Sequence, residues 1–375
     1  MRIALVVHDY HRQGGHSRYV AELAERFAIR HEVHVFANGY PGGLPASTPN
    51  LHFHRVWAQR KTALGTVLSF FYPATRALGT EGPFDIVHAQ GFVCQKSDVL
   101  TAHICCAAWH EQRVASGYEL SWKENLFDQV VMKLEGWLYG KDPSQPVIAI
   151  SKRVEEDLKR FCNRNSKVKV IWHGVDTKEF DVASKVQWRA EVRKELGLGD
   201  KEFCALWVGD LRKGAKAAIE AVAKNPQQIL LAVSRNDPAP FQAIADAAGA
   251  GKRVRFIPPT NQIARYYAAA DVFLFPTTYD AFGMVALEAM AMGLPVIINR
   301  KAGAAELIEH NRNGLLLENP FDAQESAALL LKLEQEPQWR NAIGEAALST
   351  AVAQSWDQVA AETLSVYETL LREKR

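Results

Sequence analysis

The sequence contains few cysteines and no long apolar run. Its five cysteines are an odd number without regular spacing, which excludes a disulfide framework and predicts buried thiols in a reducing cytosol. No stretch of about 18 uninterrupted apolar residues occurs, so we expect no membrane-spanning helix. These absences predict a cytoplasmic protein, and they leave open a contact with the inner face of the cell membrane.

An excess of charge of one sign is also missing. The formal net charge is +2 and no strongly basic block occurs, which argues against nucleic acid as the main partner. No pair of cysteines has metal-ligand spacing beside histidines, so we expect no metal site. The G-x-G-x-x-G fingerprint is absent from both halves, which disfavours a dehydrogenase. We therefore expect no resident cofactor.

What the chain does contain is a regular alternation of short apolar runs and amphipathic helical patterns. Its 375 residues are 48% apolar and 23% charged, which suits a globular protein of two domains. The alternation predicts an α/β fold with doubly wound sheets. We predict strands at 3–7, 33–36, 85–88, 99–102, 147–150, 203–208, 229–233, 254–257, 272–275 and 296–298. A turn-rich stretch at 172–180 predicts the linker between the domains.

The most informative segment runs from Thr278 to Ile297. It begins as a polar loop after a buried strand and continues into a helix. A strand, a polar loop and a helix N-terminus together present backbone N–H groups and a positive dipole end to a phosphate. Asp280 in the loop and Glu288 in the helix flank that position, where carboxylates can hold hydroxyl groups. The combination suits a sugar nucleotide.

The whole segment resembles the donor-site signature of retaining GT-B glycosyltransferases, with Phe282-Gly283 in the loop and Gly293-Leu294-Pro295 after the helix. This large family includes lipopolysaccharide-core glucosyltransferases and other bacterial sugar-nucleotide transferases. Its signature usually begins and ends with glutamate. This chain has Asp280 at the first position, which is one methylene shorter and bears on the identity of the sugar and on how closely it is held.

The resemblance implies a GT-B fold, in which two Rossmann-like doubly wound domains face each other across a cleft. The implied parts are an N-terminal acceptor-side domain, a nucleotide-sugar domain and a C-terminal helix that crosses back to the first domain, at 1–175, 176–352 and 353–375. Glu288 is then expected to bind the ribose hydroxyls and Asp280 to position the sugar. The helix start at Phe282, Gly283 and Met284 is expected to hold the diphosphate.

Two cations follow the strand at 203–208, at the end where doubly wound folds bind ligands. Arg212 supplies a planar fork for phosphate oxygens, and Lys213 supplies a mobile point charge. They match the family's Arg…Lys-Gly element, although the turn before them, Asp210-Leu211, is shorter than usual. The resemblance implies a metal-independent reaction in which both cations stabilise the departing nucleotide diphosphate.

The first half carries a glycine loop and two histidines at predicted strand ends. In the loop Gln13–Arg18, Gly14 and Gly15 match the family's element that borders the donor phosphate and the acceptor. His103 matches the family histidine that approaches a hydroxyl of the donor sugar, so we expect it to be catalytic. We expect His88 to face the cleft and help to shape the acceptor pocket. A further histidine, His173, is expected to be structural at the hinge.

Residues 122–139 carry large apolar side chains at helical spacing, with a mixed polar side. One interpretation is a helix that packs in the core. The other is an acceptor-side element that rests on the membrane interface, with its tryptophans at headgroup level. Its placement is similar to the membrane-facing insertion of lipopolysaccharide-core glucosyltransferases, which favours a lipid-linked or cell-envelope acceptor.

We therefore predict a retaining, metal-independent glycosyltransferase that moves a hexose or related sugar from a nucleotide-diphosphate sugar to a cell-envelope glycan or lipid-linked acceptor. The sequence offers no obvious carboxylate nucleophile, so the resemblance implies that the acceptor hydroxyl attacks from the leaving-group side and gives its proton to a phosphate oxygen.

The alternative from another class is a glycosyltransferase-like subunit that binds without turnover, for which Asp280 in place of glutamate is the indication. The presence of Arg212, Lys213 and Glu288 argues against it, because a lapsed site has no physical need for them. An epimerase or a phosphorylase of the same fold would need an acid/base arrangement or a pyridoxal-phosphate lysine motif that we do not find.

Overall fold

A computed structural model describes residues 1–12, 14–199 and 201–374. The chain forms two compact units. The first unit comprises Met1–His173 together with Trp356–Arg375, and the second comprises Gly174–Ser355. The chain therefore leaves the first unit once and returns to it for its last helix.

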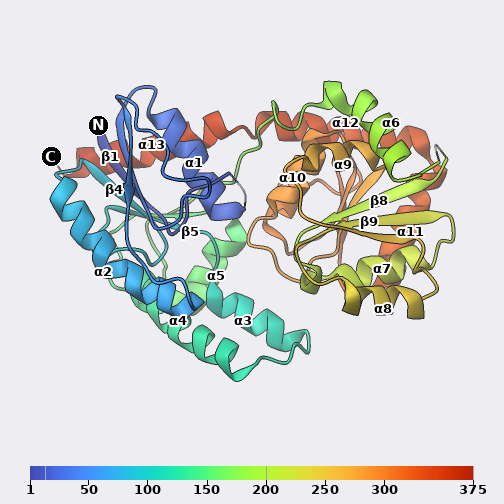
Figure 1. The fold of residues 1–375 in the computed structure, drawn as a ribbon, viewed down its shortest axis with the longest axis horizontal. Helices are drawn as coiled ribbons and strands as arrows, with labels where there is room; N and C mark the ends of the chain where they lie inside the picture. Colours follow the sequence, from blue (N-terminus) through green and yellow to red (C-terminus); the bar gives the residue numbers. More distant parts are fainter. Residues whose placement is uncertain (13, 200, 375) are drawn as a thin grey trace. The chain divides into compact units, whose positions relative to one another are not determined.

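The first unit is built on a seven-stranded parallel sheet (Figure 1). Its strand order, β3-β2-β1-β4-β5-β6-β7, reverses between β1 and β4. The central strand β1 has no exposed side chain from Ile3 to Val6, since helices cover both faces of the sheet. The strands are β1 (Arg2–Val6), β2 (Glu32–Ala37), β3 (Leu51–Arg55), β4 (Ile86–Gln90), β5 (Val99–Ala102), β6 (Val147–Ala149) and β7 (Val168–Val170).

The helices of the first unit form two layers. In Figure 1, α1 and α13 lie on one side of the sheet, and α2 and α4 lie on the other. The side chain of Ser121 accepts a hydrogen bond from the Glu124 N–H and so caps the start of α4, as a serine before a helix commonly does. The helices are α1 (Gly15–Phe27), α2 (Ala63–Glu81), α3 (Cys106–Ala115), α4 (Trp122–Gly140), α5 (Lys152–Cys162) and α13 (Trp356–Glu373).

The second unit repeats the plan with a six-stranded parallel sheet in the order β10-β9-β8-β11-β12-β13. Its strands are β8 (Phe203–Val208), β9 (Gln228–Val233), β10 (Val254–Ile257), β11 (Val272–Phe275), β12 (Val296–Asn299) and β13 (Leu315–Leu317). Its α-helices are α6 (Lys185–Glu195), α7 (Ala215–Ala223), α8 (Ala239–Ala247), α9 (Ile263–Ala269), α10 (Met284–Ala291), α11 (Ala323–Gln335) and α12 (Pro337–Ala353).

The strand order of the second unit reverses between β8 and β11, which are hydrogen-bonded neighbours. Doubly wound sheets bind ligands at the carboxyl ends of the strands at such a reversal. The predicted fold class, two Rossmann-like doubly wound α/β domains, is confirmed. The predicted set of strands was incomplete, because it lacked β3, β7 and β13, which all lie at sheet edges.

The last helix, α13, packs on α1 within the first unit. Trp356 at its start and Tyr367 near its end are both fully buried. The Tyr367 hydroxyl lies 2.6 Å from His88 Nδ1 on β4, and Arg26 of α1 donates to the Asp357 carboxylate at 2.6 Å. The C-terminal segment is therefore an integral layer of the first unit.

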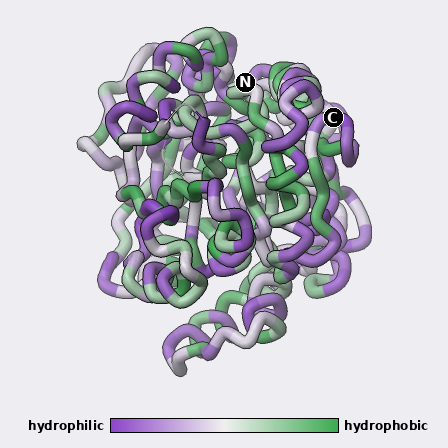
Figure 2. Tube along the Cα trace, turned by 90° about the vertical axis from the view of Figure 1, so that its right-hand side faces the viewer, coloured by the Kyte–Doolittle hydropathy of each residue, from purple (hydrophilic) through white to green (hydrophobic). Residues whose placement is uncertain are grey.

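Among the described residues, no helix is both long enough and apolar enough to cross a lipid bilayer. The tube in Figure 2 accordingly alternates hydrophobic and hydrophilic residues along the helices.

Candidate active site

The loop after β11 is held at three points by backbone and amide groups of its neighbours. The Thr278 N–H donates to the Lys213 carbonyl at 2.7 Å, and the Asn299 side chain donates to the Thr277 carbonyl at 2.7 Å. The Gly303 N–H donates to the Asp280 carbonyl at 3.1 Å. Because three separate segments fix this loop, the Asp280 side chain and the start of α10 are positioned before any ligand arrives.

Glycine is needed where two of those segments approach the loop. A Cβ on Gly214 would lie 2.2 Å from the Pro276 carbonyl oxygen, and the φ of Gly214 is +136°. A Cβ on Gly303, in the 3₁₀ helix η3 (Gly303–Leu307), would lie 2.2 Å from the Ala281 carbonyl oxygen. Only glycine lets these backbones come so close to the loop.

Helix α10 starts directly at the end of the loop. Gly283 precedes its first residue, the first turn contains no acidic residue, and no side chain of the described residues caps it. The Phe282 ring is buried, so a contact of this residue with a ligand comes from its backbone. The first N–H groups of α10 and the positive end of its dipole therefore make an anion-binding position.

The two predicted cations lie beside this loop on the 3₁₀ helix η2 (Leu211–Lys213). Lys213 Nζ lies 3.3 Å from Asp280 Oδ2, and the two side chains are 28% and 21% exposed. The Arg212 guanidinium lies 2.6 Å from the Asp210 carboxylate and is half exposed. Burial raises the pKa of Asp210, but its hydrogen bonds from Arg212 outweigh burial and leave that pKa below its ordinary value.

Glu288 lies in the second turn of α10, the helix that begins at the end of the loop. Its Oε2 accepts a hydrogen bond from the hydroxyl of Tyr267 at 3.1 Å, and the same hydroxyl lies 3.0 Å from the Val285 carbonyl. Tyr267 is fully buried on α9, and Glu288 is nearly so. The tyrosine fixes the orientation of a carboxylate that can accept hydrogen bonds from hydroxyl groups.

Predicted site residues of the first unit lie at the ends of β1 and β5. Gly14 precedes α1 with a φ of +92°, and no side chain of the described residues caps that helix. Gln13, which belongs to the predicted glycine loop, lies outside the described residues. His103 follows β5 and its Nε2 lies 2.8 Å from the Gln90 side-chain oxygen.

The proton on His103 can be assigned from that contact. An amide oxygen only accepts, so Nε2 carries the proton and Nδ1 is an acceptor. Nδ1 is buried and has no partner among the described residues. Burial, with His16 and His173 nearby, holds the pKa of His103 well below its ordinary range, so the ring is neutral. A neutral imidazole with an open acceptor suits a hydroxyl donor.

Two family comparisons match different parts of the chain. The family described as glycosyl transferases group 1 matches residues 189–350, in the second unit. The family described as Glycosyltransferase Family 4 matches residues 13–179, nearly all in the first unit. Together with the fold, these matches decide the family. The chain is a GT-B glycosyltransferase.

Relatives along the whole chain agree with this assignment. An uncharacterized glycosyltransferase of Methanocaldococcus jannaschii is 27% identical, with 98% of each chain covered. The D-inositol 3-phosphate glycosyltransferase 2 of Catenulispora acidiphila is 26% identical, with 96% of this chain and 91% of the relative covered. These are enzymes of sugar transfer by name, and the chain is accordingly a glycosyltransferase enzyme.

Solved structures share the fold of this glycosyltransferase. WaaG, a glycosyltransferase involved in lipopolysaccharide biosynthesis, has a TM-score of 0.82 at 22% identity, with 97% of this chain and 99% of WaaG covered. Sucrose-phosphate synthase of Thermosynechococcus elongatus has a TM-score of 0.83 at 24% identity and 99% coverage of both. Anabaena HepE in complex with UDP and glucose has a TM-score of 0.73 at 21% identity, with 97% and 99% covered.

The expectation for His88 is wrong. Its side chain has no exposed surface, and its Nδ1 and Nε2 lie 2.6 Å from the Tyr367 hydroxyl and from Thr101 Oγ1. Burial lowers the pKa of His88 to about 3. The residue therefore ties the sheet of the glycosyltransferase to α13 and shapes no pocket.

The helix at 122–139 does not fit a purely core-packing role. Helix α4 buries two carboxylates, those of Asp128 and Glu135, and leaves Trp122, Leu126 and Trp137 exposed by 71%, 50% and 49%. Asp128 pairs with Arg113 and lies 2.7 Å from His110 Nδ1, both on α3. The large apolar side chains of α4 are thus divided, since Leu138 and Tyr139 are buried while the two tryptophans and Leu126 reach the surface. Membrane contact of this helix stays a prediction.

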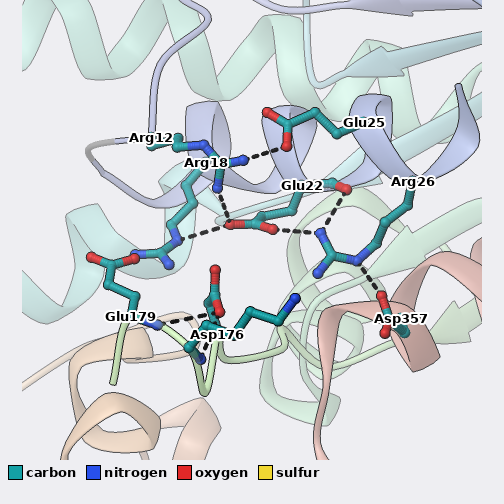
Figure 3. A network of polar contacts seen from close by, with 9 residues as sticks. Arg12, Arg18, Glu22, Glu25, Arg26, Asp176, Glu179 and Asp357 are labelled. Atoms are coloured by element: carbon teal, nitrogen blue, oxygen red, sulfur yellow. Dashed lines mark hydrogen bonds and ion pairs between the residues drawn. The ribbon is translucent and has the colours of Figure 1, made fainter. Parts of the chain in front are cut away.

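A network of ion pairs on α1 was not predicted (Figure 3). Glu22 is 1% exposed and lies 3.0 Å from Arg12, 3.5 Å from Arg18 and 2.5 Å from Arg26. The Arg26 guanidinium also reaches Asp357 of α13. The spacing of Arg18, Glu22 and Arg26 at four-residue intervals is visible in the sequence and was the available signal. The network fixes the helix that begins at the glycine loop.

Proposed function

We propose that this glycosyltransferase transfers a sugar from a nucleotide-diphosphate sugar to an acceptor hydroxyl, with retention of anomeric configuration and without a metal ion. One observation carries the proposal. Lys213, delivered by the end of β8, lies 3.3 Å from Asp280, delivered by the end of β11, beside the first turn of α10. A cation, a sugar-binding carboxylate and a helix N-terminus thus converge at the reversal of the sheet.

Each group has a role in this proposal. Lys213 and the N–H groups of α10 neutralise the diphosphate as charge develops on it during bond cleavage. Arg212 exchanges its pairing with Asp210 for a phosphate oxygen, which a half-exposed guanidinium can do at small cost. Glu288, oriented by Tyr267, accepts the ribose hydroxyls. Asp280 accepts hydroxyls of the transferred sugar.

In this proposal, retention of the anomeric configuration follows from the role of the Asp280 carboxylate. Asp280 is paired with a lysine, which suits hydrogen bonding to the sugar better than nucleophilic attack. The acceptor hydroxyl therefore attacks on the side of the leaving group, and a phosphate oxygen of the donor takes its proton. His103 of the first unit supports the sugar by accepting a hydrogen bond at Nδ1.

The donor proposal is tested by thermal stabilisation of the purified protein with UDP, GDP, ADP and their sugars in the presence of EDTA. A ligand that binds only the folded state raises the melting temperature. A shift with one nucleotide, followed by turnover and an α-linked product from an α-linked donor by NMR, supports the proposal. Binding without turnover on any acceptor favours the binding subunit, and no shift with any nucleotide contradicts both.

For the acceptor, we propose a cell-envelope glycan or a lipid-linked sugar reached from the cytoplasmic membrane surface. The exposed tryptophans of α4 support it, because indole rings are favourable at headgroup level. Co-sedimentation with anionic phospholipid vesicles should fall several-fold in Trp122→Ser/Trp137→Ser. Trp57→Ser, a change at a tryptophan that is 67% exposed elsewhere in the first unit, is the matched control. Equal sedimentation of all three proteins would remove the membrane contact.

A further inference from the structure

The second unit also contains a polar cavity at the amino ends of β11 and β12, whereas the candidate active site lies at the carboxyl ends of β8 and β11. The volume of the cavity is about 250 Å³, and its lining includes Asp271 and Pro295, which come just before β11 and β12. The residues of the active site follow β8 and β11 instead. A four-residue strand such as β11 spans about 13 Å, so the two positions are separated by the length of the strands.

Positive charge dominates this cavity. Lys185, Arg189 and Arg340 line it, and Asp271 is the carboxylate among its lining residues. Asp271 is already engaged, because it lies 2.7 Å from Arg189 and accepts from the Cys204 N–H at 2.8 Å. It also lies 3.5 Å from Arg193. The local charge is therefore positive even when the carboxylate is counted.

The remaining two cations are held by neutral groups. Lys185 Nζ donates to the Gly293 carbonyl at 3.3 Å, and Arg340 donates to the Leu333 carbonyl at 3.1 Å. Within the part of the chain that the structure describes, neither makes an ion pair with a carboxylate. Burial, followed by the proximity of Arg189, lowers the pKa of Lys185 to about 8. Because burial disfavours the charged form of Lys185, an anion bound next to its ammonium group would stabilise that form.

Two helix starts lie beside the cavity but do not add to this charge. Lys185 is the first residue of α6, and Arg340 and Asn341 lie in the first turns of α12. Helix α6 continues from a 3₁₀ turn, Val182–Ser184, that is capped by Asp181, and the N-cap residue of α12 is the acidic Glu336. The positive charge of the cavity therefore comes from its side chains.

We propose that this cavity is a binding site for a phosphoryl dianion, namely inorganic phosphate or the phosphate group of a small phosphomonoester. Three convergent cations and the Asn341 amide match a compact group of oxygen acceptors. The volume lies below the roughly 300–1,000 Å³ of pockets that enclose drug-sized ligands. A small anion fits this volume better than a nucleotide does.

The test is the melting temperature of Lys213→Ala protein, in which phosphate binding at the active site is weakened. Sodium phosphate is titrated against sodium chloride of equal ionic strength. A rise of about 2 °C or more is expected at saturating phosphate. Adding Lys185→Met should abolish the rise, and so should adding Arg340→Gln. Lys252→Met, which changes an exposed lysine of the same unit, should leave it in place.

If phosphate acted only as a stabilising salt, it would raise the melting temperatures of Lys213→Ala and of its three double variants equally. That result would overturn the site. A rise that is present in the parent chain but absent from Lys213→Ala would place phosphate at the active site alone and would also overturn it. Because Lys185→Met keeps the aliphatic stem, the test stands even if Arg340→Gln folds poorly. A parallel titration with glycerol phosphate separates the sources: tighter binding identifies a phosphomonoester as the ligand, and equal binding identifies phosphate itself.

Discussion

Lys213 and Asp280 are 67 residues apart in the sequence and within hydrogen-bond reach in the fold. Each was predicted from its own motif, the first from a basic pair after a strand and the second from a loop before a helix. Their distance could not be predicted, because it depends on β8 and β11 being neighbours in the sheet. The sheet thus turns two local motifs into one site.

Lys213→Ala should lower turnover by about 10²–10³-fold, since the removal of one preorganised group from a developing anion has effects of this size. Stability should change little, because this ion pair still reaches solvent and such a pair contributes about 0–1 kcal/mol. The measurement is kcat beside the melting temperature, with Lys216→Ala as the control for loss of an exposed lysine nearby. Turnover equal to that of the parent chain would remove the phosphate role from Lys213.

Histidines show how far residue chemistry depends on burial. His88 and His103 both lie at the ends of predicted strands, and the sequence alone predicted that both face the cleft. In the structure, His88 has both ring nitrogens satisfied in the core, whereas His103 keeps a buried acceptor without a partner among the described residues. The difference arises from Tyr367 of α13, a residue 279 positions away from His88.

At the scale of elements, the donor loop depends on close backbone contacts. Gly303→Ala should destabilise the second unit by about 1–3 kcal/mol, because its Cβ would enter the space of the Ala281 carbonyl and neither backbone can yield easily. Donor binding should weaken with it, since Asp280 is fixed by the Gly303 N–H. Chemical denaturation and donor affinity are the two measurements.

Gly136→Ala is the matched control for that substitution. This glycine lies inside α4, and a Cβ there meets nothing within 4 Å. Alanine has the higher helix propensity, so the control should be neutral or stabilising by up to about 1 kcal/mol. If Gly303→Ala behaved like the control, the loop would be more adaptable than its contacts indicate.

The ion-pair network of α1 should hold the first helix to the last. Glu22→Gln leaves three arginines facing a neutral amide, and we expect a loss of about 3 kcal/mol in the free energy of unfolding. The value is at the low end for a broken buried pair, because Arg12 and Arg26 also reach solvent. Denaturant unfolding of the parent protein and of Glu22→Gln measures this loss in the free energy of unfolding.

Glu25→Gln provides the comparison on the same helix. Glu25 pairs with Arg12 but is 43% exposed, so its loss should cost less than about 1 kcal/mol. Equal effects of the two substitutions would mean that burial of Glu22 does not strengthen its pairing.

The strands missing from the prediction all lie at a sheet edge, although the edge strand β10 was predicted. The central strands β1 and β8 are continuous apolar runs and were identified from the sequence. Strands β3, β7 and β13 are edge strands, and β7 and β13 have three residues each. So short a run carries no period, whereas β3 (Leu-His-Phe-His-Arg) does alternate apolar and polar side chains, a signal that was available in the sequence.

For α4 the sequence left two interpretations open, a helix that packs in the core and an element at the membrane interface. Helix α3 supplies Arg113 and His110 to the buried Asp128 carboxylate, and its Cys106 N–H donates to the Glu135 carboxylate at 2.7 Å. Figure 1 shows α3 and α4 extending together from the rest of the first unit. Hydrophobic periodicity alone could not predict the two buried carboxylates, because their partners come from another helix.

At the scale of the whole molecule, ionisable side chains are divided unequally between the two units. Eleven of the twelve histidines belong to the first unit, and His310 is the other. Burial lowers the pKa to about 4 for His8 and about 3 for His88 and His173, and lowers that of His103 as well. These rings are neutral in the folded state at neutral pH.

The first unit should therefore be the acid-sensitive one. A histidine with a depressed pKa in the folded state contributes stability above its unfolded pKa of about 6.5, and this stability is lost as pH falls toward the folded value, at up to about 1.4 kcal/mol per pH unit for each. Burial raises the pKa of Glu135 to about 7 and also raises that of Glu25; these two carboxyls act in the opposite direction but are fewer than the four histidines. Hydrogen exchange at pH 7 and pH 5 should show faster opening of the first unit alone.

Equal opening of both units at pH 5 would contradict this assignment, since His8, His88, His103 and His173, whose pKa values burial lowers, all belong to the first unit.

The sequence by itself determined the fold class and the family and predicted the donor-site groups, because buried parallel strands, glycine turns and helix starts are encoded within a few consecutive residues. Only the tertiary structure decided which of those groups meet. It paired Lys213 with Asp280, fixed Glu288 with Tyr267, buried His88 behind α13 and gathered Lys185, Arg189 and Arg340 around one cavity. The physical reason is that charge pairing, burial and ring protonation depend on through-space neighbours, which strand order and helix packing select.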